Sequence, residues 1–120
     1  MDGETTIQEL KDKMQAFCEE RDWDQFHGAK DLAIGVITEA SEILEHFRFK
    51  SEEQIVELFA NPDKKTAISE EMADVLILLA RMAQKYDVDL SEAYRDKMAK
   101  NEKKYPVEKA KGSNKKYNEL

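Results

Sequence analysis

The chain has 120 residues, of which 38% are charged and 41% hydrophobic, with only 4 glycines, 2 prolines and a formal net charge of -7. This composition predicts a single domain, residues 1–120, built from helices, and it excludes global disorder. The acidic balance argues against a nucleic-acid partner, and the lack of an apolar run of roughly 18 residues argues against a membrane partner. Cys18 is the only cysteine, which fits a reducing compartment, so we expect a soluble cytoplasmic protein.

The first predicted element is a helix near the beginning of the chain. A capping-box pattern at residues 6–9 places its start near Thr6, and its apolar periodicity ends near Arg21. Cys18 lies four residues after Met14 on the apolar face. This position favours a core thiol over a reactive one.

An aromatic loop follows at residues 21–28, where the sequence RDWDQFHG breaks the helical periodicity. It brings together Trp23, Phe26 and His27. One interpretation is a hydrophobic plug over a helix end, which composition alone favours. The other is a stacking site for a planar ligand such as a nucleobase.

The helix predicted over Ala29–Phe47 organises the rest of the chain. Its apolar residues recur at steps of three and four, as in an amphipathic helix: Leu32, Ala33, Val36, Ile37, Ala40, Ile43, Leu44 and Phe47. At about 100° per residue, Glu39 and Glu42 lie together on one flank of this stripe, with His46, whereas Glu45 points away. Because a half-buried carboxylate needs a partner, the pair predicts a site for a hard cation with oxygen ligands.

Two more helices are predicted in the middle of the chain. Ser51 and Gln54 form a second capping-box pattern, which opens a short helix, and residues 61–63 (NPD) are typical of a turn that closes it. A long helix then follows from about Lys65 to Tyr86. It has a core stripe and, on nearly the opposite side, a second apolar strip made of Ala73, Ile77 and Ala80. In a chain this short, the second strip predicts contact with another subunit.

Glu71 and Asp74 lie on the same flank of this long helix as Glu39 and Glu42 do on theirs. If the two helices pack antiparallel, the four carboxylates converge. All-oxygen ligation favours Mg²⁺, with Mn²⁺ as the alternative, over iron or zinc. A ferritin-like di-iron site would need Glu-x-x-His pairs, which this chain lacks. The other interpretation of the four acidic residues is a solvated, salt-bridged surface.

The last helix is predicted to begin at Asp89 and to stop before Pro106. Lys97, Asn101 and Lys104 share one of its faces, which suits either the counter-charge for substrate phosphates or a solvated surface. Residues from about 107 to 120 are polar and lysine-rich, so we expect a loose C-terminal tail.

Four segments in this order resemble the MazG-like, all-α nucleoside triphosphate pyrophosphohydrolases, and among them the dCTP pyrophosphatases. The segments are ERDWDQFH (20–27), EASEILEHFRFK (39–50), EEMADVLILLARMA (70–83) and the KM-x-x-N-x-x-KYP pattern (97–106). Together they span the chain from about Glu20 to Pro106.

The resemblance implies a helical bundle of about four to five helices, assembled as a dimer or a dimer of dimers. It implies that Mg²⁺ is held by the catalytic carboxylates Glu39, Glu42, Glu71 and Asp74. It further implies triphosphate binding by Lys97, Asn101, Lys104 and Tyr105. The base would lie near Trp23, Phe26, His27 and Phe49.

We therefore expect a Mg²⁺-dependent hydrolase that converts a deoxynucleoside triphosphate to the monophosphate and pyrophosphate and so clears unwanted nucleotides. dCTP pyrophosphatases often have Trp at the position of Phe49, Asn at that of Asp31 and Tyr at that of Leu78. These differences predict a preference for dCTP with measurable activity on other deoxynucleotides. The alternative is a non-catalytic helical module that only dimerises through the second apolar strip.

Overall fold

The computed structural model describes residues 1–120 and contains helices but no strands, which confirms the predicted all-α fold. The elements in chain order are α1 (Ile7–Glu20), the 3₁₀ turn η1 (Asp24–Phe26), α2 (Ala29–Phe47), α3 (Glu52–Ala60), α4 (Pro62–Lys85), α5 (Leu90–Lys104), α6 (Val107–Ala110) and η2 (Tyr117–Glu119). They form two compact units, residues 1–87 and 88–120. The single domain expected from the sequence stays a prediction. No helix combines the length and the apolar composition needed to cross a bilayer.

Local capping explains where the helices begin. The Thr6 hydroxyl accepts a hydrogen bond from the Glu9 N–H at 3.1 Å, and α1 starts directly after it. Ser51 and Gln54 form a complete capping box at the start of α3. Each such N-cap stabilises a helix by about 1 kcal/mol, because it satisfies N–H groups that have no partner inside the helix. The predicted starts of these two helices are confirmed.

The start of α4 differs from the sequence-based expectation of about Lys65, because the helix already begins at Pro62. The Asn61 side chain accepts hydrogen bonds from the N–H groups of Asp63 and Lys64. Proline suits the first helical position because its φ is already helical and its missing N–H would have had no partner there. The predicted turn is therefore the cap of the helix.

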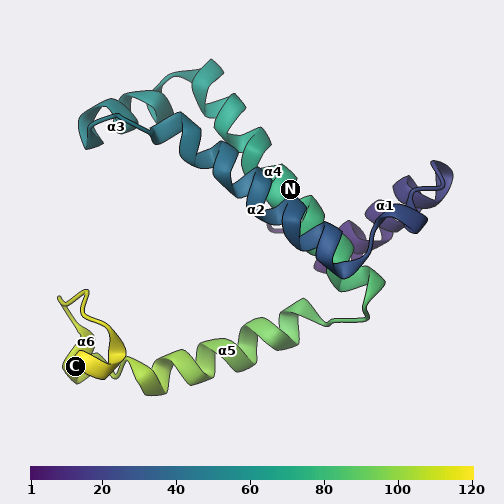
Figure 1. Ribbon diagram of the computed structural model, residues 1–120. Helices are drawn as coiled ribbons and strands as arrows, with labels where there is room; N and C mark the ends of the chain where they lie inside the picture. Colours follow the sequence, from purple (N-terminus) through teal and green to yellow (C-terminus); the bar gives the residue numbers. More distant parts are fainter. The chain divides into compact units, whose positions relative to one another are not determined.

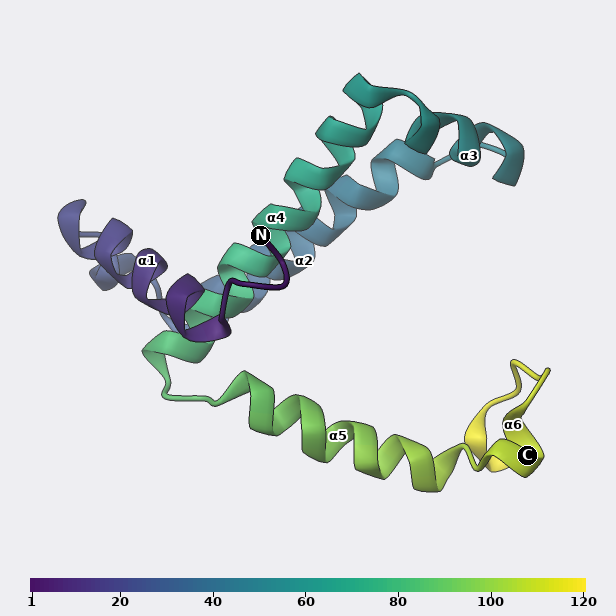
Figure 2. The ribbon, with the colours of Figure 1, turned by 180° about the vertical axis from the view of Figure 1, so that it is seen from behind.

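α2 and α4 lie side by side and run antiparallel, as Figures 1 and 2 show. The pairing is close at Gly35, where an added Cβ would lie 3.0 Å from Cδ1 of Leu78. Leu32 of α2 and Ile68 of α4 are buried in this unit. The two helices therefore have the antiparallel packing that the predicted convergence of their carboxylates required.

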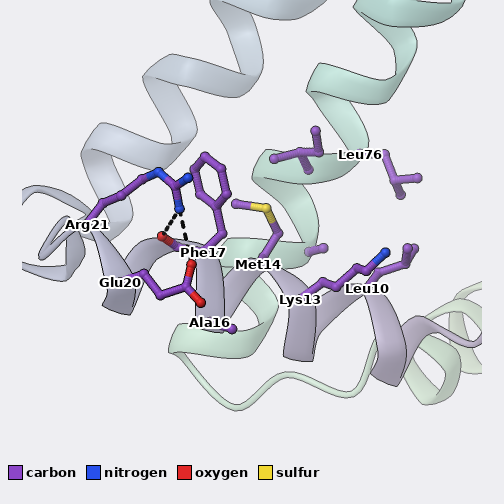
Figure 3. Close-up of a pocket in the computed structure, with 10 residues that line it drawn as sticks. Leu10, Lys13, Met14, Ala16, Phe17, Glu20, Arg21 and Leu76 are labelled. Atoms are coloured by element: carbon purple, nitrogen blue, oxygen red, sulfur yellow. Dashed lines mark hydrogen bonds and ion pairs between the residues drawn. The ribbon is translucent and has the colours of Figure 1, made fainter.

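α1 packs against α4 near the C-terminal end of that helix and leaves a groove of about 510 Å³ between them. Figure 3 shows Met14 and Phe17 of α1 and Leu76 of α4 among the residues that line it. Ala80, part of the predicted second strip, is buried, and Cys18 is fully buried, as expected of a core thiol. Contact of this strip with another subunit stays a prediction.

The apolar stripe of α2 is only partly covered within the chain. Leu32 is buried and Val36 is half-buried, whereas Ile37 and Leu44 are exposed. The stripe is wider than the surface that α4 can cover, because each helix contributes only one face to a helix pair. Part of the stripe is therefore exposed in the single chain.

The second unit consists of α5, α6 and η2. The ring of Tyr117 lies 6.4 Å from that of Tyr105, edge to face, and the Lys104 ammonium lies 4.9 Å from the Tyr117 ring centre. Residues 107–120, for which the sequence predicts a loose tail, include the four-residue α6 and these aromatic contacts.

Candidate active site

Three carboxylates converge between α2 and α4. Glu39 and Glu42 are one turn apart on α2, and Glu71 faces them from α4. One oxygen from each of the three lies within 4.8 Å of the others. The antiparallel packing brings them together, as the matching flanks of the two helices predicted.

The electrostatics of this acidic cluster reflect its crowding. Loss of hydration raises the pKa of Glu39 above its ordinary value, and the neighbouring charge of Glu42 adds to the effect. A hydrogen bond with Glu42 is the main cause that raises the pKa of Glu71. Carboxylates that repel one another in this way gain from a cation placed between them.

Asp74 lies one turn beyond Glu71 and is more exposed than Glu39 and Glu71. It contributes no oxygen to the group of three, but its charge helps to raise the pKa values of Glu39 and Glu71. Of the four predicted ligands, three are therefore brought together and the fourth stands beside them. His46 Nε2 lies 3.9 Å from Oε1 of Glu71, so it borders the same cluster.

The donor set fits a hard divalent cation. All three groups offer carboxylate oxygens, which Mg²⁺ prefers. Oxygens bound to one Mg²⁺ are at most about 4.2 Å apart, and the three oxygens here lie within 4.8 Å of one another, which is near that limit. With three ligands from the chain, the remaining positions around such an ion would be available to water and phosphate.

The aromatic loop is attached to α4 by basic side chains. Nη2 of Arg81 donates to Oδ1 of Asp24 at 2.6 Å, and Nε of Arg81 donates to Nδ1 of His27 at 3.3 Å. Lys85 Nζ donates to the backbone carbonyl of Asp24 at 2.7 Å. The loop thus has a defined position at one end of the α2–α4 pair.

Aromatic surface remains accessible in this loop. Trp23 is 43% exposed and packs edge to face against Phe17, with ring centres 5.6 Å apart. Its ring lies 6.4 Å from that of His27. Phe26 is more exposed than Trp23. The loop is therefore both a partial cover for α1 and an open aromatic surface.

Phe49 does not join this surface within one chain. It follows the C-terminal end of α2 and is 92% exposed. The loop lies before the N-terminal end of that helix, and 19 residues at 1.5 Å each separate the two ends by about 28 Å. A single chain therefore does not place Phe49 beside Trp23.

The predicted phosphate-binding residues belong to the second unit. Lys97, Asn101 and Lys104 lie on α5, and Tyr105 is its C-cap. Lys104 also contacts the Tyr117 ring. The location of these residues in a separate unit leaves their part in the site a prediction.

Arg81 is the functional candidate that the sequence reasoning missed. It is the only buried charged side chain of the protein. The sequence did indicate its position, because Arg81 follows Asp74 by seven residues and so lies on the same flank of α4 as Glu71 and Asp74. A partner for it was not evident, since Asp24 is 57 residues away in sequence.

The fold and the site together define a class of protein: all-α, with an antiparallel helix pair that gathers carboxylates from both helices beside an aromatic loop. The sequence model of the MazG-like family matches residues 34–120. The chain is 35% identical to dCTP pyrophosphatase 1 of Bos taurus over 118 residues, covering 98% of this chain and 70% of that protein. It is also 35% identical to dCTP pyrophosphatase 1 of Homo sapiens over 117 residues, covering 98% and 69%.

A solved structure agrees with these sequence matches. The crystal structure of a pyrophosphatase from Archaeoglobus fulgidus superposes with a TM-score of 0.78 at 36% identity. The match covers 83% of this chain and 92% of that one. The chain therefore belongs to the MazG-like family.

Proposed function

We propose that this protein hydrolyses deoxynucleoside triphosphates, dCTP in preference, to the monophosphate and pyrophosphate with Mg²⁺ as the cofactor and Mn²⁺ as a substitute. The chain is a nucleoside triphosphate pyrophosphatase of the MazG-like family; the metal, the preferred base and the site residues are the proposal. The observation that carries it is the convergence of oxygens from Glu39, Glu42 and Glu71 within 4.8 Å. The biological role we propose is removal of unwanted nucleotides from the pool.

The four acidic residues hold the metal and handle a proton. Glu39, Glu42 and Glu71 bind the cation, and Asp74 adds negative charge beside them. A bound Mg²⁺ supplies positive charge for the phosphate oxygens and makes a nucleophilic water available at neutral pH. One of the carboxylates accepts a proton during hydrolysis, and a raised pKa, as at Glu39 and Glu71, suits that task.

The aromatic loop holds the base. Trp23 and Phe26 offer ring faces, and stacking on such faces is worth roughly 1–3 kcal/mol per base. The names of the mammalian relatives support dCTP as the preferred substrate. Because stacking tolerates any base, activity on other deoxynucleotides should be measurable.

Lys97, Asn101, Lys104 and Tyr105 are the proposed contacts for the triphosphate. A lysine ammonium donates charge-assisted hydrogen bonds to phosphate oxygens, which are stronger than neutral ones. Asn101 and Tyr105 add neutral hydrogen-bonding groups on the same stretch of α5. Loss of one lysine should therefore raise KM for every nucleotide alike.

We also propose that the protein is a homodimer or a dimer of dimers. The exposed apolar residues of α2 and α4 support this, since contiguous apolar surface usually marks an interface; they include Ile34, Ile37, Leu44, Met72 and Leu76. Phe49 supports it as well, because only a second copy can supply this ring to a base held at Trp23.

A nucleotide panel tests the proposal. The purified protein is incubated with each of the four deoxynucleoside triphosphates and Mg²⁺, and the products are separated by ion-exchange chromatography. We expect dCMP and pyrophosphate as the fastest products and no hydrolysis when Mg²⁺ is chelated. Release of inorganic phosphate from the γ position, or equal rates with and without the metal, would overturn the proposal.

A further inference from the structure

The most unusual side chain outside the acidic cluster is Arg81. It is 1% exposed, and a buried charge is stable only when it is paired and its N–H groups are satisfied. Each part of its guanidinium has a partner: Nη2 donates to Asp24, Nε donates to His27, and Nη1 donates to the Gln84 side chain. Two of these partners belong to the aromatic loop, so Arg81 fixes the loop to α4.

The attachment has two points. Asp24 receives Arg81 Nη2 at 2.6 Å, and Lys85 Nζ lies 3.7 Å from the same carboxylate oxygen. Its carboxylate nevertheless remains largely exposed. The Arg81 hydrogen bond holds the pKa of Asp24 below its ordinary value, so the pair stays ionised at neutral pH. The second point is the His27 ring.

The hydrogen bond to His27 determines which nitrogen of its ring carries the proton. An arginine Nε always carries a hydrogen and only donates. Nδ1 of His27 must therefore be the acceptor, and the proton of the neutral imidazole sits on Nε2. The Cys18 sulfur lies 3.7 Å from the same Nδ1.

Nε2 of His27 is free to meet a ligand. The contacts of the ring with Cys18 and with Arg81 both use Nδ1. Nε2 is not a buried atom without a partner, since the protein has no such side-chain nitrogen or oxygen. The ring is only half-buried and stands beside Trp23, with 6.4 Å between ring centres. His27 thus carries an N–H donor in the same loop as the proposed stacking surface, on a ring that adjoins Trp23.

We propose that Arg81 is a positioning residue for base selection: it locks His27 as an Nε2–H donor beside Trp23, and that donor selects cytosine over thymine and uracil. This inference rests on the proposed function. N3 of cytosine is an acceptor, whereas N3 of thymine and of uracil carries a hydrogen. The Nε2–H group of His27 can therefore donate to N3 of dCTP. With dTTP or dUTP it would face the N3–H group, and two facing donors without an acceptor disfavour binding.

The first experiment reads the tautomer directly. The protein has only two histidines, so long-range ¹H–¹⁵N NMR spectra of the ¹⁵N-labelled protein resolve both rings. We expect one ring, assigned as His27 through His27→Phe, to be a single Nε2–H tautomer at neutral pH. Arg81→Lys has no Nε–H group and should give a mixture of tautomers, whereas Arg95→Lys, at an exposed position of α5, should leave the spectrum unchanged. A His27 ring protonated at Nδ1 in the wild type would overturn the inference, even if Arg81→Lys does not fold.

The second experiment measures selection. The ratio of kcat/KM for dCTP to that for dTTP should fall by about three- to tenfold in Arg81→Lys and in His27→Phe, because one neutral hydrogen bond is lost. An analogue of dCTP with C–H in place of N3 should react more slowly with the wild type by a similar factor. With His27→Phe the analogue and dCTP should react alike. The kcat for dCTP should change less than KM, since these residues do not touch the phosphates.

The two levels of proposal can fail separately. If the wild type does not hydrolyse dCTP with Mg²⁺, the proposed function fails. If it does, but Arg81→Lys and Arg95→Lys give the same dCTP to dTTP ratio, Arg81 has no part in base selection. Equal rates for dCTP and the N3-modified analogue in the wild type would contradict the role of His27.

Discussion

Glu42→Gln is the sharpest perturbation of the acidic cluster. Glu42 is the shared neighbour: its carboxylate acts on both Glu39 and Glu71 and raises the pKa of each. The substitution keeps the size and an oxygen but removes the charge. We expect turnover of dCTP to fall by at least about a hundredfold.

The magnitude follows from the number of ligands. Three oxygens within 4.8 Å supply the protein's share of the metal shell, so neutralising one removes a third of that charge. Loss of a group that merely orients a ligand already costs about 10–100-fold in metal affinity. A direct ligand should cost at least as much, and activity should recover in part as Mg²⁺ is raised tenfold or more.

Calorimetric Mg²⁺ titration and thermal melts supply readouts apart from activity. Without Mg²⁺, Glu42→Gln should melt at a higher temperature than the wild type, because carboxylate repulsion is relieved. Adding Mg²⁺ should raise the melting temperature of the wild type more than that of Glu42→Gln, since a ligand that binds only the folded state stabilises it.

Two carboxylates serve as matched controls. Glu45 is on the same helix but pairs with Arg48 at 3.3 Å, away from the cluster. Glu70 directly precedes Glu71 and is exposed. Glu45→Gln and Glu70→Gln should have small effects in every assay. Glu39→Gln and Glu71→Gln should resemble Glu42→Gln. Asp74→Asn should also lose at least about a hundredfold in turnover. Small and equal effects at all six positions would refute the metal site.

Three further expectations concern the loop, the assembly and the pH. Trp23→Ala should raise KM for dCTP by about five- to a hundredfold with a smaller loss in kcat. The fluorescence of Trp23, the only tryptophan, should change when the wild type binds a non-hydrolysable dCTP analogue. Normal kinetics and unchanged fluorescence would mean that the loop only covers a helix end and does not hold the base. Ile77→Glu should dissociate or unfold the protein, whereas light scattering that shows a folded wild-type monomer at micromolar concentration would contradict the proposed assembly. Loss of hydration and the Arg81 charge lower the pKa of His27 in the folded protein. Below about pH 6.5 the unfolded chain therefore binds a proton at His27 more readily than the folded protein does, and the free energy of unfolding should decrease as the pH falls. Urea titrations at several pH values would measure this decrease, which should be smaller in His27→Phe.

The sequence by itself determined the five longer helices, α1 to α5, and the faces they present, but not the short α6 in the predicted tail. Caps such as Thr6 and Ser51 and the apolar spacing over Ala29–Phe47 act within one or two turns, so the chain carries them locally. The matching flanks of Glu39 and Glu71 followed from the same 100° step. The one shifted boundary, at Pro62, arose because proline suits both a turn and the first turn of a helix.

Only the tertiary structure decided which of these side chains meet. The antiparallel packing of α2 and α4 brings Glu71 into the group of three and leaves Asp74 beside it. The pairing of Arg81 with Asp24 and His27 spans more than 50 residues, and no local pattern encodes it. Such contacts depend on the relative placement of whole helices, which is fixed by packing at positions such as Gly35 rather than by the periodicity of either helix.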